Sequence, residues 1–231
     1  LKAGDKVYAC HMGKTLALFN IGKQPLENGM KILGAHIDSP RIDVKQNPLY
    51  EDSDMALLDT HYYGGIKKYQ WVAMPLAIHG VVALKNGKTV DVVIGEDKND
   101  PVFCVTDLLI HLSQEQLKKR ADSVIEGEQL DILFASKPLE GKEKEAVKAA
   151  VLELLEKKYD MKEEDFLSAE LEIVPAGKAR NCGIDESMIM AYGQDDRVCA
   201  YTSLVAMIEA ENPDKTTCCL LTDKEEIGSV G

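Results

Sequence analysis

Three short clusters of acidic residues, each beside an apolar segment, most strongly constrain how this chain can fold. Asp38 follows the run MKILGAHI, Asp195 and Asp196 come shortly before CAYTSLVAMIEA, and Glu225 and Glu226 follow TTCCLLT. If the ends of these segments meet, like charges about 4 Å apart repel by about 4 kcal/mol at an effective dielectric constant near 20. Since a folded domain is stable by only roughly 5–15 kcal/mol, such a fold needs a compensating cation.

Each cluster taken alone also has an ordinary structural interpretation. His36 and Asp38 share one face of a strand, but a hydrogen-bonded histidine before a turn-forming Asp explains this pair equally well. Asp195 and Asp196 suit the acidic first turn of a helix, and the third cluster suits a solvated loop. Only the combination favours a metal site, because histidine with carboxylates is a ligand set for zinc, cobalt or manganese.

The pattern of apolar and turn-forming residues predicts an α/β fold. The runs KVYACHMG, KTLALFNIG and MKILGAHID indicate strands, 39–68 reads as polar and irregular, and Asn86-Gly87 marks a hairpin. Helices are expected over GKEKEAVKAAVLELLEKKYD, over CAYTSLVAMIEA and, capped by Thr106, over DLLIHLSQEQLKKRA. This order predicts an α/β unit begun by residues 1–70 and resumed by 187–231, with a strand-and-helix module at 71–186 between them.

Composition excludes some classes of function. The net charge of −12 argues against a nucleic-acid binder, and there is no apolar run long enough to span a membrane. The six cysteines form no C-x-x-C pair, which favours free thiols and a cytoplasmic location. The chain begins without Met and stops after an acidic turn, so we expect a fragment of a longer protein that lacks both ends.

The motifs GAHIDSPR, QDDRV and KEEIGS, in this order, resemble the metal-site motifs of the aspartyl aminopeptidase family of di-zinc aminopeptidases. YGGI at 63–66 and the nearby PLAIHG agree with the resemblance, which covers essentially the whole chain. It implies a partial zinc-exopeptidase catalytic domain of α/β fold at 1–70 and 187–231. It also implies that a mixed β/α insert domain at 71–186, which mediates subunit contacts, interrupts this catalytic domain.

The resemblance also implies roles for individual residues. His36 matches a metal ligand, and Asp38 matches the acidic catalytic residue that supports it. Asp195 matches the carboxylate that bridges two metals, Glu225 the catalytic general base, and Glu226 the next metal ligand.

Other positions carry weaker expectations. Asp196 stands where relatives often have Asn or Asp, and the Asp195–Asp196 bond is a candidate cis peptide. His111 resembles a histidine that reaches a neighbouring subunit's active site, although packing within its own subunit is an alternative. Arg41 and Lys67 are loose candidates for binding an acidic substrate. The resemblance places the remaining metal ligands beyond Gly231, so the fragment alone is expected to be inactive.

The resulting hypothesis is a metal-dependent aminopeptidase that acts on peptides and forms a large homo-oligomer. Two divalent ions, zinc or else cobalt or manganese, would hold a bridging water that Glu225 deprotonates. The residue removed would be acidic, with neutral residues as an alternative. A related di-zinc carboxypeptidase or deacylase and a catalytically inert assembly scaffold remain open. No nucleic acid or membrane partner is expected.

Overall fold

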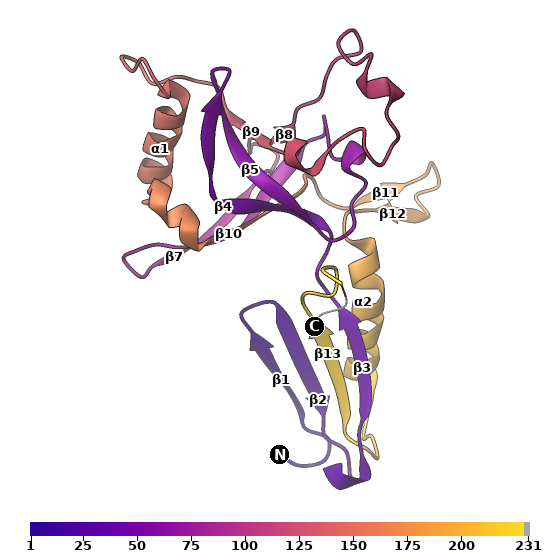
Figure 1. Ribbon diagram of the computed structural model, residues 1–231. Helices are drawn as coiled ribbons and strands as arrows, with labels where there is room; N and C mark the ends of the chain where they lie inside the picture. The colour runs from indigo at the N-terminus through magenta and orange to yellow at the C-terminus, as the bar shows by residue number, and fades with distance from the viewer. Residues whose placement is uncertain (229–231) are drawn as a thin grey trace. The chain divides into compact units, whose positions relative to one another are not determined.

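The structure, a computed structural model, describes residues 1–228 and divides the chain into two compact units (Figure 1). The first unit contains residues 1–40 and the chain from Gly193 onward, and the second contains Arg41–Tyr192. The expected boundaries at 70 and 186 differ from these, because residues 41–63 form strands of the second unit's sheet. The last three positions of the predicted segment 187–231 lie outside the described residues.

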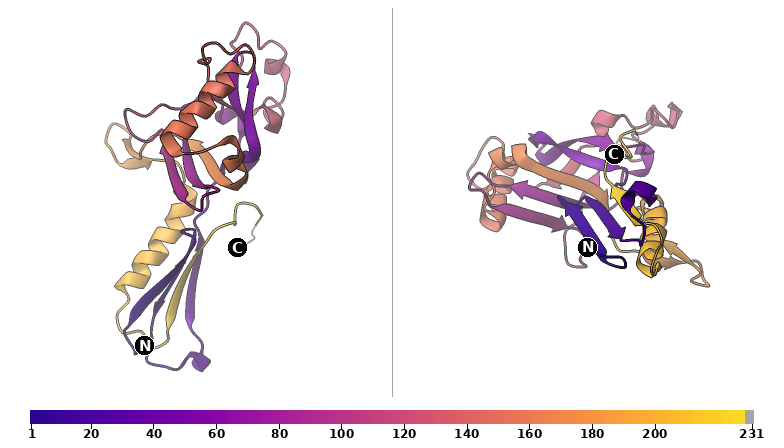
Figure 2. Two further views of the ribbon diagram at one scale, coloured as in Figure 1. Left: turned by 90° about the vertical axis from the view of Figure 1, so that its left-hand side faces the viewer. Right: turned by 90° about the horizontal axis from the view of Figure 1, so that it is seen from below.

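The first unit is a four-stranded sheet with one α-helix. Its strand order is β1-β2-β13-β3, in which β3 runs parallel to β13 and the other neighbours are antiparallel. Helix α2 packs along one face of this sheet, as the left view of Figure 2 shows, and its Ala200 and Met207 contact Cys219 and Leu221. The elements are β1 (Lys6–His11), β2 (Thr15–Asn20), β3 (Lys31–His36), α2 (Gln194–Glu209) and β13 (Thr217–Thr222).

The second unit is built on a seven-stranded sheet of order β7-β6-β10-β4-β5-β9-β8, and β11 and β12 form a separate hairpin. Helix α1 covers part of the sheet, and the core between them includes Val147, Val151 and Leu155. The elements are β4 (Arg41–Asp52), β5 (Met55–Tyr63), β6 (Leu76–Ala83), β7 (Thr89–Ile94), β8 (Cys104–Val105), β9 (Ile132–Ala135), α1 (Ala146–Tyr159), β10 (Ala169–Pro175), β11 (Arg180–Cys182) and β12 (Met188–Met190).

Short 3₁₀ helices join these elements. They lie at Leu26–Asn28, Lys68–Gln70, Gln116–Lys118, Gly127–Gln129 and Glu163–Ser168.

The predicted irregular stretch at 39–68 was wrong, because most of it forms the long antiparallel pair β4 and β5. Ala56, Leu58 and Thr60 alternate along β5 and are all buried, which is the pattern of a half-buried strand. A register irregularity between Val44 and Leu49 accommodates Pro48 in β4. The sequence hides this alternation because the buried positions include the small Ala56 and the polar Thr60, whereas the apolar Leu57 lies between buried positions.

The helix predicted after Thr106 was also wrong. The structure has a turn at His111 and the 3₁₀ helix Gln116–Lys118 in this segment. Leu109 and Leu112 are exposed, so no other element covers the apolar side that a helix here would present. A short helix without such tertiary packing is only marginally stable in water. The predicted hairpin at Asn86-Gly87 and the two other helices are confirmed.

Two further expectations concern covalent state and membranes. All six cysteines are free thiols, as predicted. Within residues 1–228, no helix is both long and apolar enough to cross a bilayer.

Candidate metal centre

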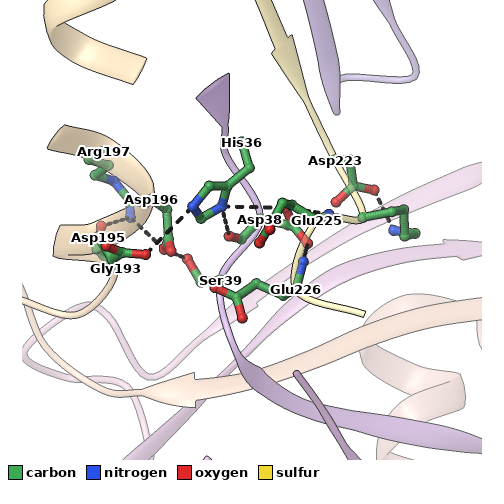
Figure 3. A network of polar contacts seen from close by, with 11 residues as sticks. His36, Asp38, Ser39, Gly193, Asp195, Asp196, Arg197, Asp223, Glu225 and Glu226 are labelled. Carbon is green, nitrogen blue, oxygen red and sulfur yellow. Dashed lines mark hydrogen bonds and ion pairs between the residues drawn. The ribbon is translucent and has the colours of Figure 1, made fainter. Parts of the chain in front are cut away.

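All three acidic clusters lie at one edge of the first unit's sheet (Figure 3). Because β3 and β13 are parallel, with His36 paired to Thr222, their carboxyl ends meet at the same edge. Helix α2 runs in the opposite sense: the carbonyl of Ala210, at its carboxyl end, accepts a hydrogen bond from Asn20 at the far end of the sheet. The amino end of α2, with Asp195 in its first turn, therefore lies at the edge where β3 and β13 end.

The side chains of His36, Asp195, Asp196 and Glu226 form one cluster. Each offers one ligand atom, and these four atoms all lie within 4.8 Å of one another. Within this cluster, Nε2 of His36 lies 3.6 Å from Oδ2 of Asp195. Asp195 is 86% exposed whereas the Asp196 side chain is only 1% exposed, so the cluster combines an open and an enclosed carboxylate.

The orientation of the His36 ring is set by its own strand end. Its Nδ1 lies 3.1 Å from the backbone carbonyl of Asp38, so a proton on Nδ1 is donated there and Nε2 is left facing the carboxylates. Burial lowers the pKa of His36, but the hydrogen bond to that carbonyl and the charges of Asp196 and Glu225 outweigh burial and raise it. An imidazole in this setting is suited to share its Nε2 with a cation.

The carboxylate of Asp38 points to the turn after β13. Its Oδ1 accepts the backbone N–H of Glu225 at 3.1 Å, and its Oδ2 accepts that of Glu226 at 3.0 Å. The side chain of Asp38 is only 1% exposed. A buried carboxylate thus ties the end of β3 to the turn that carries the third acidic cluster.

Asp196 is the most enclosed member of the four-residue cluster. Ser39 donates its hydroxyl to Oδ2 of Asp196, while Oδ1 is buried and is one of the few polar side-chain atoms in the described chain without a hydrogen-bond partner. Burial raises the pKa of Asp196, with His36 and Arg197 opposing the shift. Burial, and then the charge of Asp196, likewise raise the pKa of Glu226.

These features fit a divalent cation. Leaving a buried carboxylate oxygen without a partner is costly, and crowding a second carboxylate against it adds repulsion. A cation among the four side chains would supply the missing partner and cancel the repulsion. The donor set of one imidazole and three carboxylates suits zinc, cobalt or manganese.

The structure brings together most of the residues expected at the site. His36, Asp195 and Glu226 join one group, and Glu225 lies beside it in the same turn without belonging to the group. Sequence reasoning counted Asp196 among the crowded acidic residues but assigned it no individual role as a ligand. It also did not connect Ser39 to Asp196, because this hydrogen bond joins residues 157 positions apart. The only sequence signals for these two residues are the position of Ser39 directly after Asp38 and the position of Asp196 directly after Asp195.

Two expectations about the site need correction. No cis peptide bond occurs within the described residues, so the prediction for Asp195–Asp196 was wrong: this bond lies in the first turn of α2, where helical geometry uses trans peptides. Arg41 is not available to a substrate, because it is buried against Asp43 at 2.7 Å and Glu172 at 3.2 Å. His111 belongs to the second unit, where it is exposed in a turn.

Comparisons with known proteins agree on one family. The profile of the aminopeptidase I zinc metalloproteases (M18) matches residues 1–231. A probable M18 family aminopeptidase 1 from Clostridium acetobutylicum is 65% identical over 232 residues, covering 100% of this chain and 50% of the relative. The chain therefore spans about half the length of the curated relatives it matches.

Solved structures match over the same extent. The crystal structure of aminopeptidase I from Clostridium acetobutylicum has a TM-score of 0.93 at 65% identity, covering 100% of this chain and 51% of that chain. The M18 aminopeptidase from Thermotoga maritima has a TM-score of 0.93 at 48% identity, covering 99% of this chain and 50% of that chain. The mApe1 dodecamer of S. cerevisiae, at 21% identity and a TM-score of 0.69, covers 99% of this chain and 51% of that chain and shares the fold.

Proposed function

This chain belongs to the M18 family of aminopeptidase I zinc metalloproteases, and from this premise we propose that the full-length protein is a metal-dependent aminopeptidase. The observation that carries the proposal is the convergence of His36, Asp195, Asp196 and Glu226 at one sheet edge. The proposal concerns the full-length protein, because the chain spans about half the length of its relatives.

The proposed metal-binding residues are supported by the geometry of the cluster and by the family motifs. His36 would bind through Nε2, since its Nδ1 faces the carbonyl of Asp38. Asp195 and Glu226 would bind as carboxylates, and Asp196 offers its buried Oδ1. A bridging role for Asp195 between two ions is part of the proposal and comes from the family motif. When bound, zinc polarises the scissile carbonyl and lowers the pKa of a water molecule.

Glu225 is proposed as the general base. It is partly buried in the same turn as Glu226, and its backbone N–H is held by Asp38. Its charge acts on both His36 and Glu226, although it does not belong to the four-residue cluster. In this position the carboxylate takes a proton from the attacking water and later delivers it to the leaving amine.

Substrate selection is proposed only at the level of peptides with a free N-terminus. The cluster is open to solvent on the side of the exposed Asp195, and we propose that the free α-amino group of the substrate approaches from this side. Removal of acidic residues needs a cationic side chain, and Arg41 cannot provide it while it is paired with Asp43 and Glu172. Peptides with a neutral N-terminal residue therefore remain candidate substrates, as do peptides with an acidic one. Lys67 remains a candidate for recognising an acidic side chain.

The assembly and the location of the protein are further proposals. Since the yeast relative is described as a dodecamer, we propose a large homo-oligomer with the second unit, the counterpart of the predicted insert, making subunit contacts. The exposure of His111 suits such a contact. Free thiols at all six cysteines suit a cytoplasmic location.

The test uses the full-length protein, stripped of metal and then reloaded with zinc, cobalt or manganese. Aspartyl, glutamyl and leucyl anilides, together with their N-acetyl forms, report hydrolysis, and elemental analysis reports bound metal. Cleavage of the free amines that disappears on chelation and returns with metal is expected. Cleavage of only the N-acetyl forms would favour the deacylase or carboxypeptidase alternative, metal binding without any cleavage would favour the scaffold, and activity that survives chelation would refute the proposal.

Replacing Glu225 by Gln tests whether this residue acts as the general base or as a metal ligand. E225Q should keep its metal content and lose activity by roughly 10²–10⁴-fold, the usual contribution of a general base. Glu27→Gln is the matched control, because Glu27 is exposed and distant in the fold, in the 3₁₀ helix between β2 and β3. A near-normal rate in E225Q would exclude Glu225 as the base.

A further inference from the structure

The carboxylate of Asp38 contacts the turn after β13 more closely than it contacts the imidazole of His36. The shortest separation between the ring and this carboxylate joins Nδ1 and Oδ1 at 3.7 Å, which is too long for a hydrogen bond. The same Nδ1 lies 3.1 Å from the backbone carbonyl of Asp38. The hydrogen bond of the ring is therefore made with the backbone of residue 38, whereas the carboxylate of Asp38 accepts hydrogen bonds from the turn after β13.

The two carboxylate oxygens of Asp38 accept two successive backbone N–H groups. Glu225 donates to Oδ1 at 3.1 Å and Glu226 donates to Oδ2 at 3.0 Å, as the view of the site shows (Figure 3). These bonds begin where the sheet ladder stops: Ile37 donates its N–H to the carbonyl of Thr222, and the next contacts between the two strand ends use the Asp38 side chain.

The turn that Asp38 holds has a backbone that needs such support. Lys224 has a φ of +77°, in the left-handed region that a non-glycine residue rarely adopts. Within the turn, Gly228 donates its N–H to the carbonyl of Glu225. Hydrogen bonds to an ionised acceptor are roughly twice as strong as neutral ones, so the buried carboxylate is well suited to stabilise this conformation.

We infer that Asp38 is a positioning residue: through the N–H groups of Glu225 and Glu226 it sets the direction in which these two side chains leave the turn. Its catalytic consequence rests on the proposed function, whereas the backbone clamp itself does not. An Asn at position 38 offers one acceptor and one donor, so it satisfies one N–H and opposes the other. A Glu keeps both acceptors but places them one methylene farther along.

Backbone amide exchange in the metal-free, full-length protein tests the clamp directly. In the wild type, the amides of Glu225 and Glu226 should be protected, and Asp38→Asn should speed their exchange by about tenfold or more. The Ile37 amide, which donates to Thr222, should keep its rate in this variant. Asp5→Asn is the matched control, because Asp5 also accepts a backbone N–H, that of Lys2, but at the opposite end of the sheet.

Kinetics of the zinc-loaded, full-length enzyme provide the second readout. Asp38→Asn should lower kcat by roughly 10–100-fold with KM little changed, and Asp38→Glu should recover part of the loss. If Asp38→Asn does not fold, the wild-type amides still decide the question: exchange of both at the rate of an unstructured peptide overturns the inference. Unchanged exchange in a folded Asp38→Asn also overturns it, even if the enzyme is active. Faster exchange without any wild-type hydrolysis would support the clamp and remove the proposed function.

Discussion

Replacing Glu226 by Gln should change the stability of the full-length protein in opposite directions with and without metal. The ligand atoms of Glu226 and Asp196 lie within 4.8 Å of each other, and two full charges at that distance repel by about 3.5 kcal/mol at an effective dielectric constant of 20. The repulsion in the protein is smaller, because the raised pKa of both groups lets one of them bind a proton more easily. We expect E226Q to raise the free energy of unfolding by roughly 1–2 kcal/mol when metal is absent.

With zinc present, the same variant should be less stable than the wild type. Loss of one carboxylate ligand weakens metal binding, and a metal at 100 times its Kd stabilises the folded state by about 2.7 kcal/mol. Urea unfolding of both proteins in chelator and in excess zinc measures the two differences, with Glu27→Gln as the control in which both stay within about 0.5 kcal/mol. Lower stability of E226Q in both conditions would show that the carboxylates do not repel one another and would refute the reasoning.

Two further predictions concern Ser39 and Asp131. Ser39→Ala removes the hydroxyl that Asp196 accepts, so zinc affinity measured by competition with a chelating dye should fall roughly 10–100-fold, and Ser39→Thr should retain it; equal affinity in both variants would count against the contact. Burial raises the pKa of Asp131 above 3.8 despite its bond from Tyr50. The folded state thus binds a proton at Asp131 more tightly than the unfolded state does, so this contribution to stability is present below pH 3.8 and is lost as the pH rises through the folded pKa. In urea unfolding, the wild type should therefore lose stability relative to Asp131→Asn over this pH range. A constant difference between these two proteins from pH 3 to 6 would contradict this.

The sequence predicts elements well where burial and periodicity coincide. Val147, Val151 and Leu155 repeat every four residues, and all three are buried on α1. The apolar residues Leu109 and Leu112 carry a similar pattern but form no α-helix, because propensity cannot tell whether another element will cover them. In β5 the alternating residues include Ala56 and Thr60, which are too small or too polar to stand out.

The site shows the same limit at the level of chemistry. Motif resemblance selected His36, Asp195 and Glu226, and the parallel pairing of β3 with β13 explains how the first and last of these meet. Neither the burial of Asp196 nor its contact with Ser39 can be read from spacing, because both depend on the orientation of α2 against the sheet edge. Arg41 illustrates the converse, since its charge suggested a substrate contact but its partners lie within its own sheet.

The carboxylates of the site fall into two classes that explain how one sheet edge tolerates them all. Asp38 is compensated within the protein, because the N–H groups of Glu225 and Glu226 satisfy its two oxygens. Asp196 and Glu226 are not compensated in this way, since burial raises the pKa of both and Oδ1 of Asp196 has no partner. Asp38, the compensated carboxylate, can keep the strand ends in place when metal is absent. The close approach of Asp196 and Glu226 becomes energetically favourable only when a cation binds. If the full-length protein binds metal as proposed, binding would not need to fold the site, because the compensated carboxylate of Asp38 would already hold the turn and the uncompensated carboxylates would supply the affinity for the cation.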